Sequence, residues 1–343
     1  MNKLISVAVP CYNSAGYMRK CIESLLTGGE EVEIIIVNDG STDDTAKIAD
    51  EYAEKYPTIV KVIHKENGGH GSGVNAGIKN ASGLYFKVVD SDDWVNEEAF
   101  KKLLDTVRGH LEDGNAADLY ITNYVYEHAS DNTTNVIHYR KELPSGVLMP
   151  WDKVKKFRMS RFLMIHSLLY KLSALRESDT VLPEKTFYVD NLYAYKPLPF
   201  MKTIYYLDVD LYRYFIGRAD QSVNVTNLVK RYEQQMRVSY LIADSYTYDE
   251  IKAQPKGLRN YMFHSQETVM VITLISTCCG KPVAERKAAL KAFWQHVKAQ
   301  DKKLYKWLRW RSYATVCYLL PWGLRAKALL WGYGVAKRKL KLG

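Results

Sequence analysis

Three carboxylates lie within four residues, at Asp90, Asp92 and Asp93, directly after the stretch 86–89, which is apolar except for Lys87. The aromatic and β-branched residues of this run favour a buried strand. Like charges at such close spacing repel each other, so the cluster costs stability unless a cation lies among them. Mg²⁺ and Mn²⁺ take oxygen ligands and often share a site with substrate phosphates. The pattern therefore predicts a site for a metal and a diphosphate at the end of a strand.

The same acids have a purely structural interpretation. Ser91 or Asp92 could cap a helix that begins near Val95, with Glu97 and Glu98 in its first turn. This stretch alone does not separate the two interpretations, so the rest of the chain must be considered.

Short apolar runs alternate with helical patterns through the first hundred residues. Strands are expected at 4–9, 32–37 and 59–64, and helices at 14–26, 44–56 and 74–81. We expect Pro10 to end the first strand and Ser14 to cap the first helix. This alternation is typical of a parallel α/β sheet, in which ligands bind at the carboxyl ends of the strands.

Three of these strand ends carry polar clusters, which are Tyr12-Asn13, Asp39-Gly40-Ser41 and Asp90-Ser91-Asp92. Their convergence at one edge favours the metal and diphosphate site over a helix cap. The glycine-rich stretch 67–73 is expected to be a loop that lets a backbone approach closely. It is a weak match to a dinucleotide fingerprint, because it comes late and the first strand–helix turn lacks the glycine pattern.

The order and spacing of four blocks resemble family 2 glycosyltransferases over roughly residues 3–100. The blocks are Val9-Pro10-Cys11-Tyr12-Asn13, Val37-Asn38-Asp39-Gly40-Ser41-Thr42-Asp43, Asn67-Gly68-Gly69 with Val74-Asn75-Ala76-Gly77, and Val89-Asp90-Ser91-Asp92-Asp93. The resemblance implies a GT-A fold, a Rossmann-like nucleotide-sugar-binding α/β domain. It also implies a nucleoside-diphosphate-sugar donor, a divalent metal (Mn²⁺ or Mg²⁺) and inversion at the anomeric carbon.

The resemblance also assigns roles to individual residues. Tyr12 and Asp39 would contact the base, usually uracil, Asp90 would lie near the ribose or the metal, and Asp92 would hold the metal. The full set of implied donor-binding residues is Pro10, Tyr12, Asn13, Asp39, Asn75, Asp90, Ser91 and Asp92. Two positions depart from the family pattern: Asn38 stands where an acid is frequent, and Val74 stands where an arginine often precedes the asparagine.

Inverting transfer needs a base that takes the proton of the acceptor hydroxyl, and a carboxylate usually serves. Family members carry an acid–Asp pair in the region of residues 187–192, and this chain retains only Asp190, after Val189. Asp190 is therefore the candidate base. The less favoured alternative is that Asp190 is the N-cap of a helix through Tyr195. Both roles can hold together, and a helix N-terminus would lower the basicity of Asp190. His166 is a weaker acceptor-side candidate or a core histidine, and Arg218 is either a phosphate contact or a surface residue.

The formal net charge of +10 lies wholly in the C-terminal tail. Residues 301–343 hold eleven Lys/Arg and one acid, which leaves 37 basic and 37 acidic residues in the rest of the chain. Tryptophans and tyrosines are interleaved with these cations, and the longest uncharged stretch, 312–324, is shorter than the roughly 20 apolar residues that span a bilayer. We expect the tail to lie on an anionic inner membrane surface. Packing on the protein, a homo-oligomer contact or nucleic-acid binding are the alternatives, and nucleic acid is the least favoured.

The cysteines form no CxxC pair, their number is odd, and the N-terminus shows no secretory signal, so a reduced cytoplasmic protein is expected, peripheral on the inner face of the membrane. We expect a GT-A domain over 1–224, with a donor half (1–100) and an acceptor half (101–224), followed by a helical region over 225–343. The predicted function is inverting transfer from a UDP-sugar to a cell-surface glycan or lipid-linked acceptor. The alternatives are a non-catalytic nucleotide-sugar-binding protein that acts through its tail, and a nucleotidyltransferase. The latter is disfavoured because the first loop has no cation before Arg19.

Overall fold

The computed structural model describes residues 3–128, 133–158, 161–216, 225–312 and 314–340, which form two compact units. The first unit comprises residues 1–155 and 163–217. The second comprises 218–343 together with the short segment 156–162, which leaves the first unit and joins the helices.

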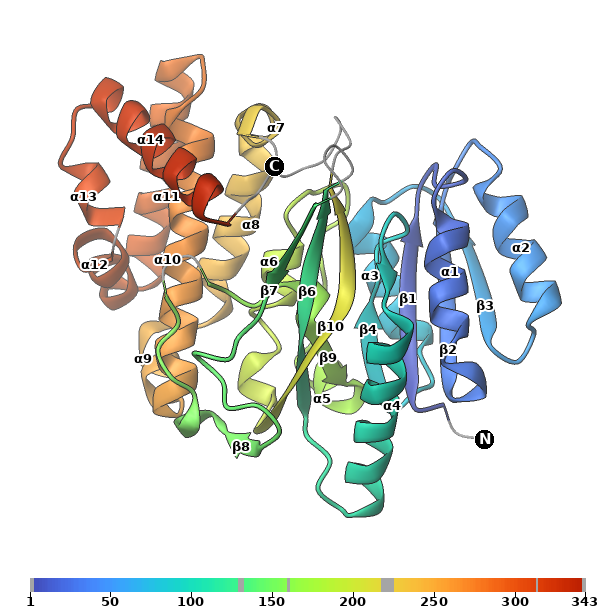
Figure 1. The fold of residues 1–343 in the computed structure, drawn as a ribbon. Helices are drawn as coiled ribbons and strands as arrows, with labels where there is room; N and C mark the ends of the chain where they lie inside the picture. Colours follow the sequence, from blue (N-terminus) through green and yellow to red (C-terminus); the bar gives the residue numbers. More distant parts are fainter. Residues whose placement is uncertain (1–2, 129–132, 159–160, 217–224, 313, 341–343) are drawn as a thin grey trace. The chain divides into compact units, whose positions relative to one another are not determined.

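The described part of the first unit contains one ten-stranded mixed sheet, with the strand order β3-β2-β1-β4-β9-β6-β10-β5, while β7 pairs with β6 and β8 with β10 (Figure 1). β1 is parallel to β2 and β4, whereas β9 runs antiparallel to β4 and β6. The strands are β1 (Ile5–Cys11), β2 (Val32–Asp39), β3 (Val60–Lys65), β4 (Tyr85–Val88), β5 (Trp94–Val95), β6 (Leu119–His128), β7 (Thr133–Ile137), β8 (Leu148–Pro150), β9 (Leu168–Lys171) and β10 (Thr203–Ile216).

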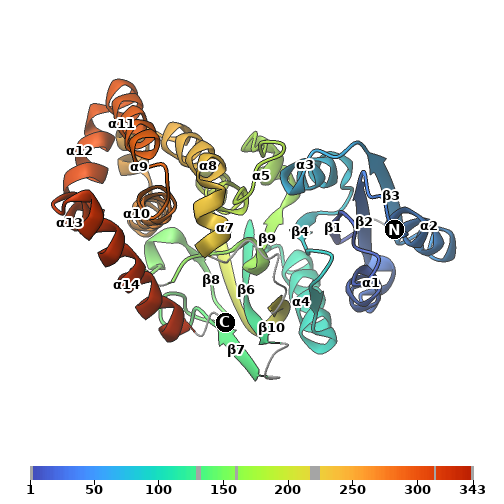
Figure 2. The ribbon, with the colours of Figure 1, turned by 90° about the horizontal axis from the view of Figure 1, so that it is seen from above.

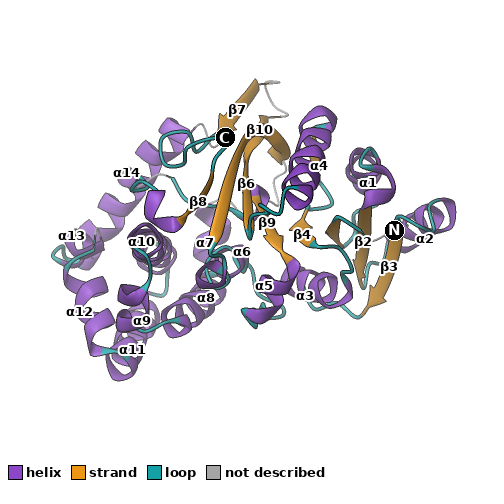
Figure 3. Ribbon diagram, turned by 90° about the horizontal axis from the view of Figure 1, so that it is seen from below, coloured by secondary structure: helices purple, strands orange, loops and turns teal. Residues whose placement is uncertain are grey.

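Helices cover both faces of the parallel part of this sheet. α3 and α5 lie on one face and α1 and α4 on the other (Figures 2 and 3). The strands β1 and β2 are buried along their whole length, as expected for a sheet covered on both sides. The helices of this unit are α1 (Met18–Leu26), α2 (Thr45–Lys55), α3 (His70–Asn80), α4 (Glu97–Glu112), α5 (Leu172–Glu177) and α6 (Asp190–Tyr193), with 3₁₀ turns η1 (Gly29–Glu31), η2 (Trp151–Lys153), η3 (Ile165–Ser167) and η4 (Leu198–Phe200).

The expected parallel arrangement is confirmed for β1 to β4, but two expectations about the first loop are wrong. β1 continues through Pro10 to Cys11, and β4 pairs with it only as far as Ala8. Beyond Ala8 this side of the strand pairs with no other strand in the described part of the chain, and there a proline is tolerated as at a sheet edge. Ser14 does not cap α1, which begins at Met18 without a side-chain cap. The Ser14 hydroxyl is instead used within the loop region described below.

The glycine-rich stretch is also more helical than expected, because α3 begins at His70 rather than at Val74. Two glycines of α3 let the helix approach β1 closely. A Cβ at Gly73 would lie 3.0 Å from Cβ of Pro10, and one at Gly77 would lie 2.5 Å from Cβ of Ala8. Close packing of the helix on the strand therefore explains these glycines.

The second unit is helical, as expected, and the long, mostly buried helix α10 contacts each of the other helices of the unit. The helices are α7 (Val225–Lys230), α8 (Tyr232–Ser245), α9 (Tyr248–Ala253), α10 (Lys256–Cys278), α11 (Val283–Gln300), α12 (Lys302–Trp310), α13 (Ala314–Tyr318) and α14 (Trp322–Leu340). Among the described residues, no helix is long and apolar enough to cross a membrane.

Candidate active site

The loops after β1, β2 and β4 meet at the carboxyl edge of the sheet. The Ser14 hydroxyl lies 2.8 Å from the Ser91 hydroxyl, which joins the first loop to the acidic stretch. Asn13, in the left-handed backbone region with φ of 49°, accepts a hydrogen bond of 2.9 Å from the backbone N–H of Thr42. The side chain of Tyr12 projects from this edge and is 55% exposed. The three polar strand ends thus form one continuous edge, as their spacing predicts.

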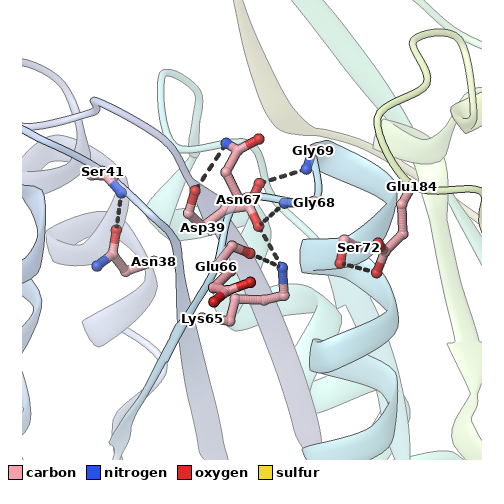
Figure 4. Close-up of polar contacts among 10 residues, drawn as sticks. All are labelled: Asn38, Asp39, Ser41, Lys65, Glu66, Asn67, Gly68, Gly69, Ser72 and Glu184. Atoms are coloured by element: carbon pink, nitrogen blue, oxygen red, sulfur yellow. Dashed lines mark hydrogen bonds and ion pairs between the residues drawn. The ribbon is translucent and has the colours of Figure 1, made fainter.

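Asp39 is buried at the end of β2 and holds the entrance to α3 (Figure 4). One carboxylate oxygen accepts hydrogen bonds from Nζ of Lys65 (2.7 Å) and the N–H of Gly68 (2.9 Å). The other accepts from the N–H of Gly69 at 2.6 Å. Because a carboxylate has about four acceptor sites, roughly one site on the second oxygen remains for a ligand.

Asp90 is paired with a histidine that the sequence analysis did not single out. Nε2 of His70, the first residue of α3, lies 2.8 Å from Oδ1 of Asp90. Burial alone would raise the pKa of Asp90, but His70 outweighs burial and lowers it. Burial likewise opposes protonation of His70, yet Asp90, with help from Asp190 and Asp92, raises the pKa of its imidazole. The pair therefore favours a charged carboxylate beside a charged imidazole.

Asp93 and Tyr212 form a buried support beneath the acidic loop. The Tyr212 hydroxyl donates to Oδ2 of Asp93 at 2.5 Å and accepts from the backbone N–H of Asp90 at 3.2 Å. Oδ1 of Asp93 accepts from the N–H of Phe215 at 2.8 Å. Burial, followed by Asp92 and Asp90, raises the pKa of Asp93 well above its usual range. Strand β10 thus fixes the backbone on which Asp90 and Asp92 stand.

His166 is buried in η3, with its ring centroid 4.4 Å from that of Tyr212. Burial lowers its pKa to about 4, so the ring is neutral near pH 7. Among the described residues its buried Nδ1 has no hydrogen-bond partner. One potential ligand atom from each of Asp90, Asp93 and His166 lies within 4.8 Å of the others. Two carboxylates and a neutral imidazole with a free lone pair fit a divalent cation such as Mn²⁺.

Asp92, the residue expected to hold the metal, is not part of this close group and is half-buried two positions after Asp90. The helix-cap interpretation of the acidic stretch is wrong. The cap of α4 is Asn96, whose side chain accepts the N–H of Ala99 at 2.9 Å. The acids are therefore left for another role.

Asp190 is the first residue of the short helix α6, and Val189 occupies the N-cap position, so the N-cap interpretation of Asp190 is wrong. Its pKa is also shifted in the opposite direction from that expected for a helix N-terminus. Burial raises the pKa of Asp190, and Asp90 adds to this effect, while His70 opposes it. The charges of His70 and Asp90 therefore act on the pKa of Asp190 in opposite directions.

The segment that leads to Asp190 is fastened to α3. The side-chain amide of Asn75 donates to the carbonyl of Leu182 at 2.8 Å and accepts from its N–H at 2.9 Å. The Ser72 hydroxyl donates to Glu184 at 2.9 Å (Figure 4). The structure therefore uses the amide of Asn75, an expected donor-binding residue, to hold this segment.

The two departures from the family pattern have structural explanations. Nδ2 of Asn38 lies 3.0 Å from Nδ1 of His64, and Oδ1 of Asn38 accepts a hydrogen bond from the N–H of Ser41. Val74 is fully buried in the core. Lys87 of β4 is a buried amine close to this site. Its Nζ donates to the carbonyl of His166 at 2.6 Å, and burial lowers its pKa to about 7. Arg218 lies outside the described residues.

Residues 6–170 match the family model described as glycosyl transferase family 2. The chain is 31% identical over 245 residues to the putative glycosyltransferase EpsH of Bacillus subtilis, across 68% of this chain and 64% of that protein. The chain belongs to glycosyltransferase family 2. It is also 40% identical over 133 residues to the glycosyltransferase GlyG of Streptococcus pneumoniae, across 38% of this chain and 42% of that protein. It thus spans less than two thirds of the length of either relative.

The GT-A fold is confirmed by a solved structure of another member of this fold. The structure of S. aureus TarS residues 1–349 in complex with UDP-GlcNAc superposes with a TM-score of 0.63 at 21% identity, across 90% of this chain and 86% of that one. At this identity the similarity establishes the fold.

Proposed function

We propose that this family 2 member is an inverting glycosyltransferase that moves a sugar from a UDP-sugar to a hydroxyl of a cell-surface glycan or lipid-linked acceptor. The observation that carries the proposal is the His70–Asp90 pair at the carboxyl edge of the sheet, whose two charges act on the pKa of the buried Asp190. The UDP-GlcNAc complex of TarS, a protein of the same fold, supports a UDP-sugar as the donor.

We assign the donor contacts to the loops that meet at this edge. Tyr12 offers an exposed ring against which a base can stack, and Asp39 retains an acceptor for a base N–H. Pro10, Asn13, Asn75 and Ser91 shape the same edge, Asn75 through the segment that it holds. His70 keeps Asp90 ionised, and Tyr212 fixes the backbone between Asp90 and Asp93.

Asp90 and Asp92, with Asp93 or His166, would hold a divalent cation, Mn²⁺ or Mg²⁺. Bound there, the ion would neutralise negative charge on the leaving diphosphate. Asp190 takes the proton of the acceptor hydroxyl. The acceptor oxygen forms a bond to the anomeric carbon as the carbon–oxygen bond to UDP breaks, and that electron pair leaves with UDP. Because its pKa is raised, Asp190 is a stronger base than an ordinary aspartate, which suits the role of general base.

The experiment that tests this role is Asp190→Asn, with Asp105→Asn on the exposed face of α4 as the matched control. Transfer from UDP-GlcNAc and other UDP-sugars is measured alongside UDP binding by thermal shift. We expect transfer to fall by about 10²–10⁴-fold, the usual worth of a general base, with UDP binding retained. Normal turnover in the variant would refute the assignment.

The competing function is nucleotide-sugar binding without transfer. It predicts a UDP-dependent thermal shift in the wild-type protein but neither donor hydrolysis nor transfer above background. The same assay therefore separates the two functions.

We further propose that the tail rests on an anionic membrane surface. Leu324, Lys327 and Trp331 follow at intervals of three and four along α14, which places them on one helix face, and all three are exposed. Trp331 is 73% exposed, and exposed Val316 and Leu319 of α13 and its end add to the apolar surface. Apolar and aromatic groups beside cations suit the headgroup region.

This proposal predicts sedimentation with vesicles that contain anionic lipid. Leu324→Ser/Trp331→Ser should lose most of the bound fraction, whereas Leu111→Ser on α4, an exposed leucine outside the tail, should not. Equal sedimentation of both variants would contradict it and favour an oligomer contact. Binding to RNA rather than vesicles would favour the nucleic-acid alternative.

A further inference from the structure

The second unit contains a cavity of about 500 Å³ whose lining includes no residue of the acidic loop. One wall is a single face of α10, with Arg259, Phe263 and Glu267 at the four-residue spacing of a helix. Residues of α9, of α12 and its C-terminal end, and of the segment 156–162 complete the lining. All lining residues lie within the second unit.

Four cations from four different segments line this cavity, namely Lys156, Lys252, Arg259 and Arg311. Within the part of the chain that the structure describes, none of the four forms an ion pair with a carboxylate. The acid among the lining residues is Glu267, which is buried. Like charges gathered around one cavity repel each other, so an anion inside it would stabilise the arrangement.

The wall that carries Lys156 is fixed to α10. Nε2 of His264 donates to the carbonyl of Arg161 at 2.7 Å, and the ring of Phe157 lies 4.7 Å, between centroids, from that of Tyr261. Lys156 and His264 both line the cavity, and burial, with a smaller contribution from Lys156, lowers the pKa of His264. The segment directly after Lys156 is thus held against α10, while the Lys156 side chain is exposed at the cavity.

Three aromatic rings stand beside the cations. The ring of Phe263 lies 4.3 Å from that of Trp307 and 5.4 Å from that of Tyr248, again between centroids. Trp307 and Tyr248 are half-buried lining residues, and the exposed amide of Asn260 lies at the same cavity. Aromatic rings pack against the C–H faces of sugars, while amides bind their hydroxyls.

We propose that this cavity binds a phosphorylated saccharide, with the phosphate among the four cations and a sugar ring against Trp307 and Tyr248. Two guanidinium groups and two ammonium groups match the oxygens of a phosphate, to which arginine donates in pairs. The site involves no donor-binding residue, so it stands whether or not the chain transfers sugar.

The test is isothermal titration with glucose 1-phosphate, inorganic phosphate and methyl glucoside, with UDP and Mn²⁺ present to occupy the donor site. Lys252→Gln/Arg259→Gln removes two cavity cations, and Lys291→Gln/Lys302→Gln removes two exposed lysines that do not line the cavity. At about tenfold for each charge-assisted contact, the Kd for glucose 1-phosphate should rise roughly 100-fold in the cavity variant. It should stay within about twofold of wild type in the control variant, since screened surface charges contribute little.

Inorganic phosphate should bind at least about tenfold more weakly than glucose 1-phosphate, and methyl glucoside weaker still, if both the charge and the ring are recognised. Equal binding of inorganic phosphate would mean an adventitious ion only, and an unchanged Kd in the cavity variant would overturn the site. Asp92→Asn separates the two proposals, because it should abolish the UDP-dependent thermal shift and leave glucose 1-phosphate binding intact.

Discussion

The contact between Asn75 and Leu182 makes the most direct prediction, because two hydrogen bonds connect the donor-side helix α3 to the segment that ends at Asp190. Asn75→Ala removes both bonds. Leu182 is 1% exposed, so its backbone N–H and carbonyl lose partners where water does not replace them readily. At about 1–1.5 kcal/mol for each bond, the variant should lose about 2–3 kcal/mol of unfolding free energy.

For a domain of this size the loss corresponds to a decrease in Tm of roughly 4–12 °C. The matched control is Asn80→Ala on the same helix. Asn80 is also half-buried, but it donates only to the carbonyl of Ala76 within α3. Both substitutions gain similar helix propensity, so the difference in Tm between them reports the contact with Leu182.

The kinetic assay decides whether this contact positions the catalytic segment. Leu182 precedes Asp190 by eight residues, so a loosened segment should lower kcat for transfer and leave the donor KM nearly unchanged. If Asn75 instead binds the nucleotide, the donor KM should rise. A Tm equal to that of Asn80→Ala, or a change confined to the donor KM, would refute the positioning role.

Two further predictions concern packing around β1 and β4. Burial lowers the pKa of Lys87 to about 7, against about 10.4 in an unfolded chain, so between these pH values only the unfolded state binds the proton and stability rises with pH. The free energy of unfolding, measured by urea denaturation, should therefore rise from pH 7.5 to 9.5 with a slope of at most about 1.4 kcal/mol per pH unit. Lys87→Met should flatten this rise. Equal slopes in the two proteins would contradict the burial of a neutral amine. Gly77→Ala would place a Cβ 2.5 Å from Cβ of Ala8 and should cost about 1–3 kcal/mol, measured by thermal unfolding. The control is Gly109→Ala on α4, whose added Cβ would meet no other described atom within 4 Å and should stabilise the protein by about 0.5–1 kcal/mol. A change in unfolding free energy of the same sign in both variants would show that α3 does not pack as described.

Much of the donor half could be predicted from local patterns. Strand and helix alternation placed β1 to β4 and the helices between them, because each element buries an apolar face whose period is visible along the chain. The rule that ligands bind at carboxyl ends then brought Tyr12, Asp39 and Asp90 to one edge. The errors lie at the boundaries, at Pro10, Ser14 and His70, where pairing partners and close packing decide the start or end of an element.

The partners of the acids depended on contacts that no local pattern encodes. Tyr212 reaches Asp90 and Asp93 across more than a hundred residues, and it contacts them only because β10 lies near the acidic loop. His70 stood within the glycine-rich stretch, and a titratable residue in a loop at the carboxyl edge was a signal that could have identified it.

The sequence by itself determined the order of the elements, the family and the position of the acidic loop, since these depend on residues close together along the chain. Tertiary structure alone decided the chemistry of that loop. Burial reversed the expected direction of the pKa shift at Asp190, and the pairing of His70 with Asp90 lowered the pKa of that carboxyl. Desolvation and charge–charge energies depend on three-dimensional distance and burial, which the spacing of residues along the chain does not specify.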